Sequence, residues 1–103
     1  MRKLVAALAL SFVLVGCAAT ERGRTSFMSV YEDSTYVYCR YEAFANAEYP
    51  EQSHAAETAR IRWLEASLRE NGLGGKSYDI ASRNVVRTYG EDGDIFYEIR
   101  VRK

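Results

Sequence analysis

Hydrophobic and polar residues alternate along the chain with two different periods, and each change of period marks a predicted element. Residues 35–45 alternate with a period of two and are rich in tyrosine and valine, which favours a strand. Residues 95–103 alternate more regularly still, and their apolar side chains share one face: Ile95, Tyr97, Ile99 and Val101. Both runs therefore predict strands with one buried face and one outer face.

Between these strands the pattern changes to a helical period. The chain has no helix-breaking residue from Ala55 to Asn71, and Pro50 fits a first helical turn because its missing N–H needs no partner there. Asn71-Gly72-Leu73 predicts a Schellman stop, with Gly72 in the left-handed region and Leu73 folded back on Leu68. Two apolar stripes follow this helix: Ile61, Leu64 and Leu68 in one, and Ala55, Ala59, Trp63 and Ala66 in the other.

The remaining segments predict two further strands and their turns. Residues 27–31 form a short first strand, and residues 32–34 form the turn after it. Residues 78–89 alternate imperfectly as a strand, with a bulge expected at 82–84. The glycine-rich and acidic segment 90–94 then indicates a hairpin that leads into the last strand.

The composition of that hairpin also predicts a register. If Asp92-Gly93 are the two turn residues, Val86 lies opposite Ile99 on the buried face. Arg87 then faces Glu98 on the outer face, where opposite charges directly across a ladder are favourable.

The order of these elements predicts a small α+β domain of two layers over residues 35–103. One helix packs on a three- to four-stranded, mainly antiparallel sheet in the order β-α-β-β. The crossover through the helix should be right-handed. We expect the C-terminal strand to lie between the other two, as in a split β-α-β unit.

An apolar run from Leu4 to Val15 follows the positive pair Arg2 and Lys3. As a helix this run reaches ~18 Å at about 1.5 Å per residue, whereas a hydrocarbon core of ~30 Å needs about 20 residues. The length and the flanking charges favour a secretory signal peptide over a transmembrane helix.

The end of this run, Leu14-Val15-Gly16-Cys17, resembles the lipobox of bacterial lipoproteins. The resemblance implies that residues 1–16 are a cleaved signal peptide and that the Cys17 thiol carries a diacylglyceryl group. Residues 17–34 are then the lipidated N-terminus and tether, and two or more acyl chains anchor a protein stably. Ala18 in the position after the cysteine implies the outer membrane, facing the periplasm, in a host with two membranes. The alternative is an ordinary cut after Ala19, which discards Cys17 and releases a soluble protein.

Charge and cysteine content narrow the function classes. The chain has 14 basic and 14 acidic residues, so cleavage, which removes Arg2 and Lys3, leaves two more acidic than basic residues. This balance gives no electrostatic footprint for nucleic acid. Because Cys17 is consumed as a thioether, Cys39 has no partner for a disulfide within the chain. It is interpreted as a core residue, with an intermolecular disulfide second and a catalytic thiol third.

No catalytic, metal or cofactor motif is found. Gly75-Lys76-Ser77 resembles the end of a phosphate-binding P-loop, but Glu70 stands where the first glycine belongs, and the helix precedes the loop instead of following it. His54 is the only histidine, and Ser53 beside it on a helix does not face it. A single histidine without a cysteine pair is also a poor zinc site. We therefore expect no enzyme activity, no metal and no cofactor.

The outer face of the sheet is the candidate binding surface. Tyrosine and arginine over apolar neighbours match the composition of interface hot spots. Alternatively the face is merely solvated, or it is covered by residues 27–31. The sequence predicts that seven residues share it: Tyr36, Tyr38, Val85, Arg87, Tyr89, Phe96 and Arg100.

These observations favour a membrane-anchored envelope lipoprotein whose small non-enzymatic domain binds another envelope protein. The second hypothesis is a cell-wall or glycan binder that uses the same tyrosines. The helix, glycine stop and following strand resemble the peptidoglycan-binding domains of outer-membrane proteins, but the Asp and Arg pair of that family has no recognisable match. A hydrolase is the third hypothesis.

Overall fold

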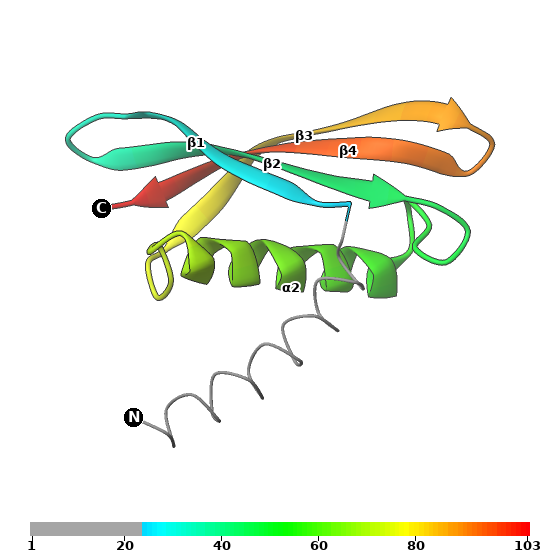
Figure 1. The fold of residues 1–103 in the computed structure, drawn as a ribbon, viewed down its shortest axis with the longest axis horizontal. Coiled ribbons are helices and arrows are strands. Elements are labelled where there is room, and N and C mark those ends of the chain that lie inside the picture. The colour runs from blue at the N-terminus through cyan, green and yellow to red at the C-terminus, as the bar shows by residue number, and fades with distance from the viewer. Residues whose placement is uncertain (1–23) are drawn as a thin grey trace, which may run out of the picture.

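The computed structural model describes residues 24–103, which form one helix and a four-stranded sheet (Figure 1). The predicted small α+β domain is confirmed. The N-terminal segment and Cys17 lie outside the described residues. Within 24–103 no helix is long and apolar enough to cross a membrane. The elements are β1 (Ser26–Glu32), β2 (Tyr36–Ala45), α2 (His54–Glu70), β3 (Tyr78–Tyr89) and β4 (Asp92–Arg102).

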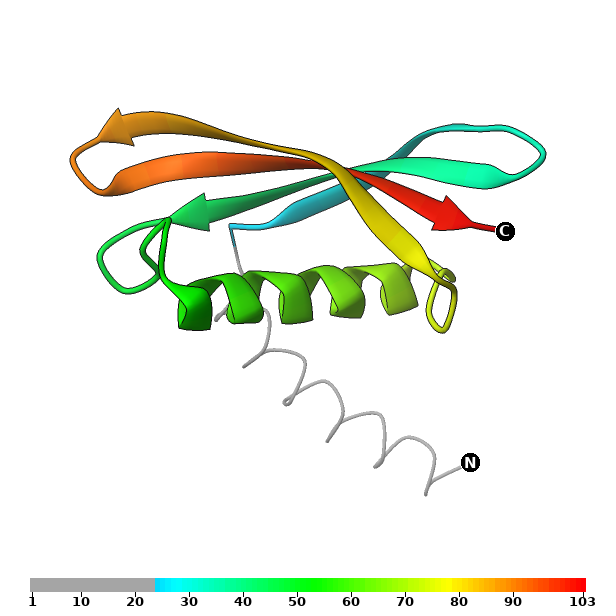
Figure 2. The same ribbon diagram turned by 180° about the vertical axis from the view of Figure 1, so that it is seen from behind.

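The strands lie in the order β1-β2-β4-β3, and every neighbouring pair is antiparallel. The C-terminal strand β4 therefore separates β2 from β3, which run parallel to each other, as the split β-α-β prediction required. The helix α2 connects these two strands and covers one face of the sheet (Figure 2). No helix formed by residues 24–103 covers the opposite face, which we call the outer face.

The helix begins later than predicted and ends where predicted. Ser53 is the N-cap, and its side chain accepts a hydrogen bond from the Ala56 N–H at 3.2 Å. The expectation that Pro50 opens the helix is wrong, because a turn separates Pro50 from His54. Gly72 has φ of 77°, and the Leu73 N–H donates to the Leu68 carbonyl at 2.8 Å. The Schellman stop is confirmed.

The core lies between α2 and the two central strands. Ile95, Tyr97, Ile99 and Val101 of β4 are at most 1% exposed, which confirms the face predicted from their alternation. Trp63 of α2 stacks on Phe44 at a ring distance of 5.5 Å and meets Tyr49 edge-on at 5.0 Å.

The predicted register of the β3–β4 hairpin is wrong. Tyr89 pairs with Asp92, so the turn residues are Gly90 and Glu91 rather than Asp92 and Gly93. Val86 lies opposite Asp94 and Arg87 opposite Gly93. Gly93 is instead a strand residue at a close approach, because a Cβ there would lie 2.9 Å from the Val86 carbonyl oxygen.

Both edge strands contain a bulge at the same level of the sheet. In β1 the register shifts around Val30, and in β3 it shifts around Ala81, one residue before the predicted segment 82–84. The two shifts flank the row in which Cys39 and Ile99 pair at the centre of the sheet. The extra residue changes which side chains face the helix along the rest of each edge strand.

Candidate functional site

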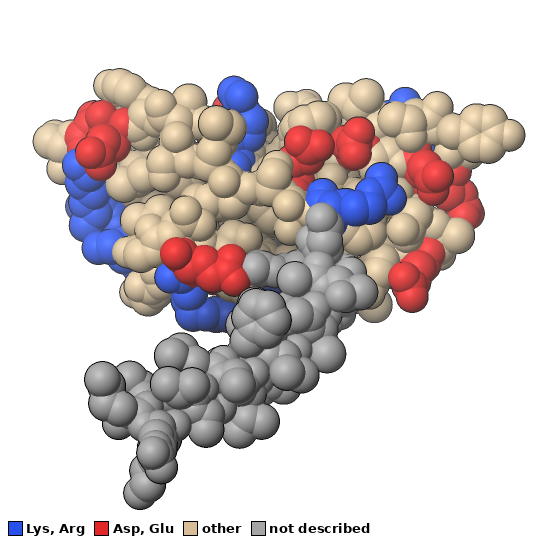
Figure 3. All heavy atoms as spheres, in the orientation of Figure 1, with Lys and Arg blue, Asp and Glu red and all other residues tan. Residues whose placement is uncertain are grey.

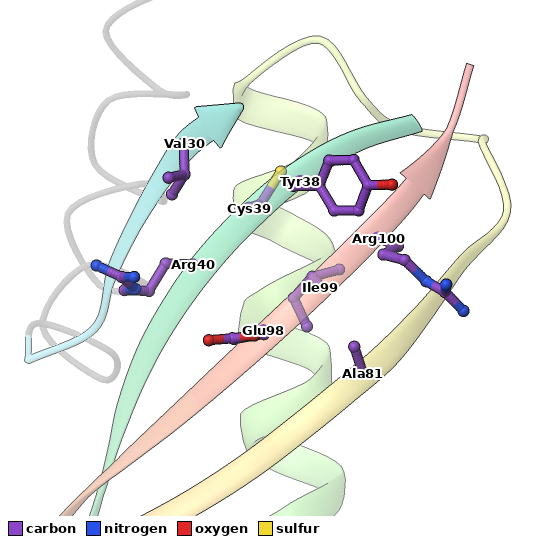
Figure 4. Close-up of a pocket in the computed structure, with 8 residues that line it drawn as sticks. All are labelled: Val30, Tyr38, Cys39, Arg40, Ala81, Glu98, Ile99 and Arg100. Atoms are coloured by element: carbon purple, nitrogen blue, oxygen red, sulfur yellow. The ribbon is translucent and has the colours of Figure 1, made fainter. Parts of the chain in front are cut away.

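The candidate site lies on the outer face, over β2 and β4. A depression of about 250 Å³ opens there, with the backbone of the two central strands as its floor (Figure 4). Val30 and Ala81, the bulged residues of the two edge strands, border it on opposite sides. Its lining consists of Val30, Tyr38, Cys39, Arg40, Ala81, Glu98, Ile99 and Arg100.

Arg40 and Glu98 are two of the charged residues that line this depression. They lie directly opposite each other on β2 and β4, and both side chains are exposed. Among residues 24–103 neither side chain has a hydrogen-bond or ion-pair partner. Both charges are therefore available to a group outside the domain.

Three tyrosines, Tyr31, Tyr36 and Tyr38, form a cluster at one end of the depression. The Tyr38 ring lies 5.4 Å from that of Tyr31 and 6.0 Å from that of Tyr36. The Tyr38 hydroxyl donates to Asp33 at 3.1 Å, and Asp33 also accepts the N–H of Tyr36 at 2.7 Å. The backbone N–H groups of the turn, that of Tyr36 first, hold the pKa of Asp33 below its ordinary value. The turn thus fixes the tyrosines in place.

Arg100 joins this cluster from β4. Its guanidinium carbon lies 5.3 Å from the centre of the Tyr36 ring, and it pairs with Asp79 of β3 at 2.6 Å. The hydrogen bond from Arg100 lowers the pKa of Asp79. A cation over an aromatic face is favourable, so this corner presents an ordered surface of aromatic rings and guanidinium groups.

The structure brings together only part of the predicted surface. Tyr36, Tyr38 and Arg100 are neighbours, as expected. Phe96 is on the same face but four residues along β4 from Arg100, ~13 Å away at about 3.3 Å per residue. Tyr89 is 85% exposed but pairs with Asp92 at the start of β4, further still from the cluster.

Arg87 and Val85 were predicted on the outer face, and this is wrong. Val85 packs against the core, and Arg87 forms an ion pair at 2.8 Å with Glu51, in the loop before α2. The bulge at Ala81 is the reason, because its extra residue places the odd-numbered positions after it on the helix side. The alternative in which residues 27–31 cover the outer face is also wrong, since β1 pairs with the edge of β2.

A second polar cluster lies between the helix and the sheet, and the sequence did not point to it. Arg60 is fully buried. Its guanidinium donates to the carbonyls of Phe44, Tyr49, Pro50 and Glu51 and to the Glu57 carboxylate, at 2.9 to 3.3 Å. Arg60 therefore ties the segment between β2 and α2 to the helix. Its position four residues after Ala56 and four before Leu64 is the available signal, because this spacing places it on the buried side.

Glu57 is the centre of this cluster. It accepts hydrogen bonds from the Tyr97 hydroxyl at 2.8 Å and from Arg83 at 3.1 Å. Burial raises the pKa of Glu57, but the bonds from Arg83, Arg60 and Tyr97 outweigh it and hold the pKa below the ordinary 4.5. Burial and the Glu57 carboxylate raise the pKa of Tyr97 to about 12. Each donor already has an acceptor, so the cluster stabilises the domain rather than offering a reactive group.

Cys39 is buried in the core at 3% exposure, as its first interpretation expected. Burial raises the pKa of its thiol, which disfavours both the reactive thiolate and a disulfide between chains.

The other candidate groups have structural roles. Ser53 uses its hydroxyl as the helix N-cap, and His54 beside it is exposed. Gly75-Lys76-Ser77 forms the loop between α2 and β3. Within residues 24–103 no three His, Cys, Asp or Glu side chains are grouped so that they could hold a metal ion.

Charge is mixed on the described part of the face that Figure 3 displays. On the side displayed in Figure 3, acidic and basic side chains are interspersed among uncharged ones, and neither sign forms a continuous patch. Comparison with known proteins found no matching family model, no similar curated protein and no similar solved structure.

Proposed function

We propose that this protein is a lipoprotein of the cell envelope, anchored through Cys17, whose small domain binds another envelope protein through the outer face. The lipobox-like sequence Leu14-Val15-Gly16-Cys17 is the observation that carries the proposal. The outer face supports the protein-binding part of the proposal, because tyrosine and arginine are among the residues enriched in binding hot spots. The depression of about 250 Å³ has room for a partner's side chain beside the unpaired charges of Arg40 and Glu98.

The position at which the N-terminal segment enters the sheet determines which end of the outer face lies nearer the anchor. The sheet begins at Ser26, inside the segment predicted as the tether, and Ser26 pairs with Glu42 at the far end of β2 from Tyr36 and Tyr38. The tyrosine cluster is thus about six residues along the strands from Ser26, or ~20 Å at 3.3 Å per residue. A lipid on Cys17 would attach the domain at the end of the sheet opposite this cluster.

Photocrosslinking in living cells tests the protein-binding half. A photoreactive amino acid replaces Arg40 on the outer face, and the matched control replaces Thr58, which is exposed on α2. We expect crosslinked products from position 40 and not from position 58. Equal or absent crosslinking from the two positions would contradict the assignment of the face.

Mass spectrometry of the native protein tests the anchor. The expected mature chain begins at Cys17 and carries acyl chains. A mature chain that begins at Thr20 without lipid would refute the proposal.

Cell-wall glycan is the alternative ligand for the same tyrosines. The ring of Tyr38 is tilted by 31° against that of Tyr31 and by 55° against that of Tyr36. Because the rings do not form one flat platform for a sugar, they favour a protein partner. Sedimentation with purified sacculi distinguishes the two ligands: the protein should stay in the supernatant, and co-sedimentation that is lost on replacing Tyr36 would establish the glycan.

A further inference from the structure

We propose that the partner of the outer face is a second copy of this chain. The two sheets would pack face to face, with a two-fold axis parallel to the strands and midway between β2 and β4. The inference rests on the proposed function and identifies the envelope protein bound by the outer face as a second molecule of this chain with the same anchor. Sheets packed in this aligned manner lie about 10 Å apart with strand directions within about 30° of each other.

The cross-strand pairs of β2 and β4 are self-complementary under this symmetry. Arg40 lies opposite Glu98, Tyr38 opposite Arg100, and Tyr36 opposite Arg102. The axis places each β2 residue of one copy over the β4 residue at the same level in the other copy. Arg40 then meets the second copy's Glu98, and two tyrosine rings meet guanidinium groups. Opposite charges would meet at the level of Arg40, and cation–π contacts would form at the two levels of Tyr38 and Tyr36.

Another orientation of the axis does not give this match. A two-fold axis along the row that joins Arg40 and Glu98 would place each strand over its own copy. Arg40 would then face Arg40, and Glu98 would face Glu98, which is unfavourable for charges in contact. Charge complementarity therefore selects the axis parallel to the strands.

The side chains around the axis are either without an ionic partner or already held in position for such contacts. Among residues 24–103 the charges of Arg40 and Glu98 have no partner, whereas Arg100 is already positioned by Asp79 at 2.6 Å. The depression of about 250 Å³ is centred between β2 and β4 and gives the long side chains of two copies room to interleave.

The proposed lipid anchor is compatible with a two-fold axis parallel to the strands. Rotation about an axis parallel to the strands leaves both copies of Ser26 at the same end of the dimer, so both lipids can enter one membrane. Confinement of the two copies to one surface raises their effective concentration. A face of this modest size can then associate without the large area that a soluble dimer requires.

A charge-swap experiment tests the proposal on the full chain in a lipoprotein-producing bacterial host. Two copies with different epitope tags are co-expressed, and recovery of one through the tag of the other is measured. Two wild-type copies should co-purify. Two Arg40→Glu copies, or two Glu98→Arg copies, should lose about tenfold or more of the recovery, because each dimer contains two like-charge contacts. Lys76→Glu, in an exposed loop away from the face, is the matched control and should leave recovery unchanged.

Mixing the two variants gives the decisive result. In a pair of one Arg40→Glu copy and one Glu98→Arg copy, the proposed axis places opposite charges together at both contacts, so recovery should return to near the wild-type value. A thermal unfolding curve of each variant separates lost folding from lost association. Variants that are folded but not rescued by mixing, or that co-purify as well as wild type, would overturn the proposal.

The outcome also separates this inference from the proposed function. If wild-type copies do not co-purify while position 40 crosslinks to a different envelope protein, the dimer is wrong and the proposed function stands. If the charge swap behaves as expected but Cys17 carries no lipid, the dimer stands and the envelope anchor is wrong.

Discussion

Replacement of Arg60 by alanine should be the most damaging single change in this domain. The side chain is fully buried, and its guanidinium bonds four backbone carbonyls and the carboxylate of Glu57. The variant would leave these carbonyls without a hydrogen-bond donor and would leave a cavity where the side chain was. Glu57 would keep Arg83 and Tyr97 as partners, so most of the damage would fall on the segment between β2 and α2.

The magnitude follows from the kind of interaction that is lost. Each of the four carbonyls would lose a hydrogen bond worth about 1 kcal/mol net. The total loss is then about 3–5 kcal/mol, against a stability of roughly 5 kcal/mol for a domain of this size. Arg60→Ala should therefore be close to unfolded at 25 °C. Arg60→Lys keeps the charge but has fewer donors in one position, so it should lose about 2 kcal/mol or more in hydrogen bonds to charged groups.

Urea unfolding followed by the fluorescence of Trp63 measures both variants. Trp63 is the only tryptophan, and it contacts Phe44 and Tyr49, two of the residues whose carbonyls Arg60 binds. With a slope of roughly 1.5 kcal/mol/M, a loss of about 3–5 kcal/mol lowers the urea midpoint by about 2–3 M. Exposed Arg40→Ala is the control and should change stability by less than about 0.5 kcal/mol. An Arg60→Ala protein within about 1 kcal/mol of wild type would refute the reasoning.

Further predictions concern pH, thiol chemistry and the helix stop. The pKa of Glu57 is below 4.5 in the folded state. The stabilisation from its carboxylate is therefore complete above pH 4.5 and is lost as the pH falls through the folded pKa. Glu57→Gln should reduce the dependence of the urea midpoint on acid pH. Tyr97, with a pKa of about 12 against an ordinary 10, should lose stabilisation as the pH rises from 10 to 12, and a flat alkaline unfolding profile would contradict this. The urea-unfolded native protein should show one reactive thiol, Cys39, which is unreactive when folded; a second thiol would mean that Cys17 is unmodified. Gly72→Ala should cost about 1 kcal/mol, because its φ of 77° is unfavourable for a residue with a Cβ, although nothing lies within 4 Å of the added Cβ; an unchanged melting curve would contradict it.

The sequence predicted the parts of the fold that have one regular period. The strands β2 and β4 and the helix α2 keep their alternation or stripe throughout, so their faces followed directly from the residues. The Schellman stop at Gly72 was equally clear, since its geometry is local. The start of the helix was harder, because Pro50 and Ser53 are both suitable first-turn residues and only the hydrogen bond of Ser53 decides between them.

The site was predicted less well, because strand β3 depends on contacts that are distant in sequence. One extra residue at Ala81 changes the face of Arg87 and Val85, and no local pattern fixes where that residue is inserted. Asp92-Gly93 resembled a turn, but the close approach of Gly93 to Val86 explains this glycine. Arg60 was missed because a charged residue on a helix is normally solvated, and its backbone acceptors become neighbours only after the loop has folded.

The paired bulges in β1 and β3 have a consequence for assembly at the edges of the sheet. A flat, unbroken border strand is a template onto which further molecules add without limit, as in a fibril. Here each border is interrupted at Val30 or Ala81, so lateral growth meets an irregular backbone on both sides. In the dimer proposed above, self-association would use the broad surface of the sheet and close after two molecules.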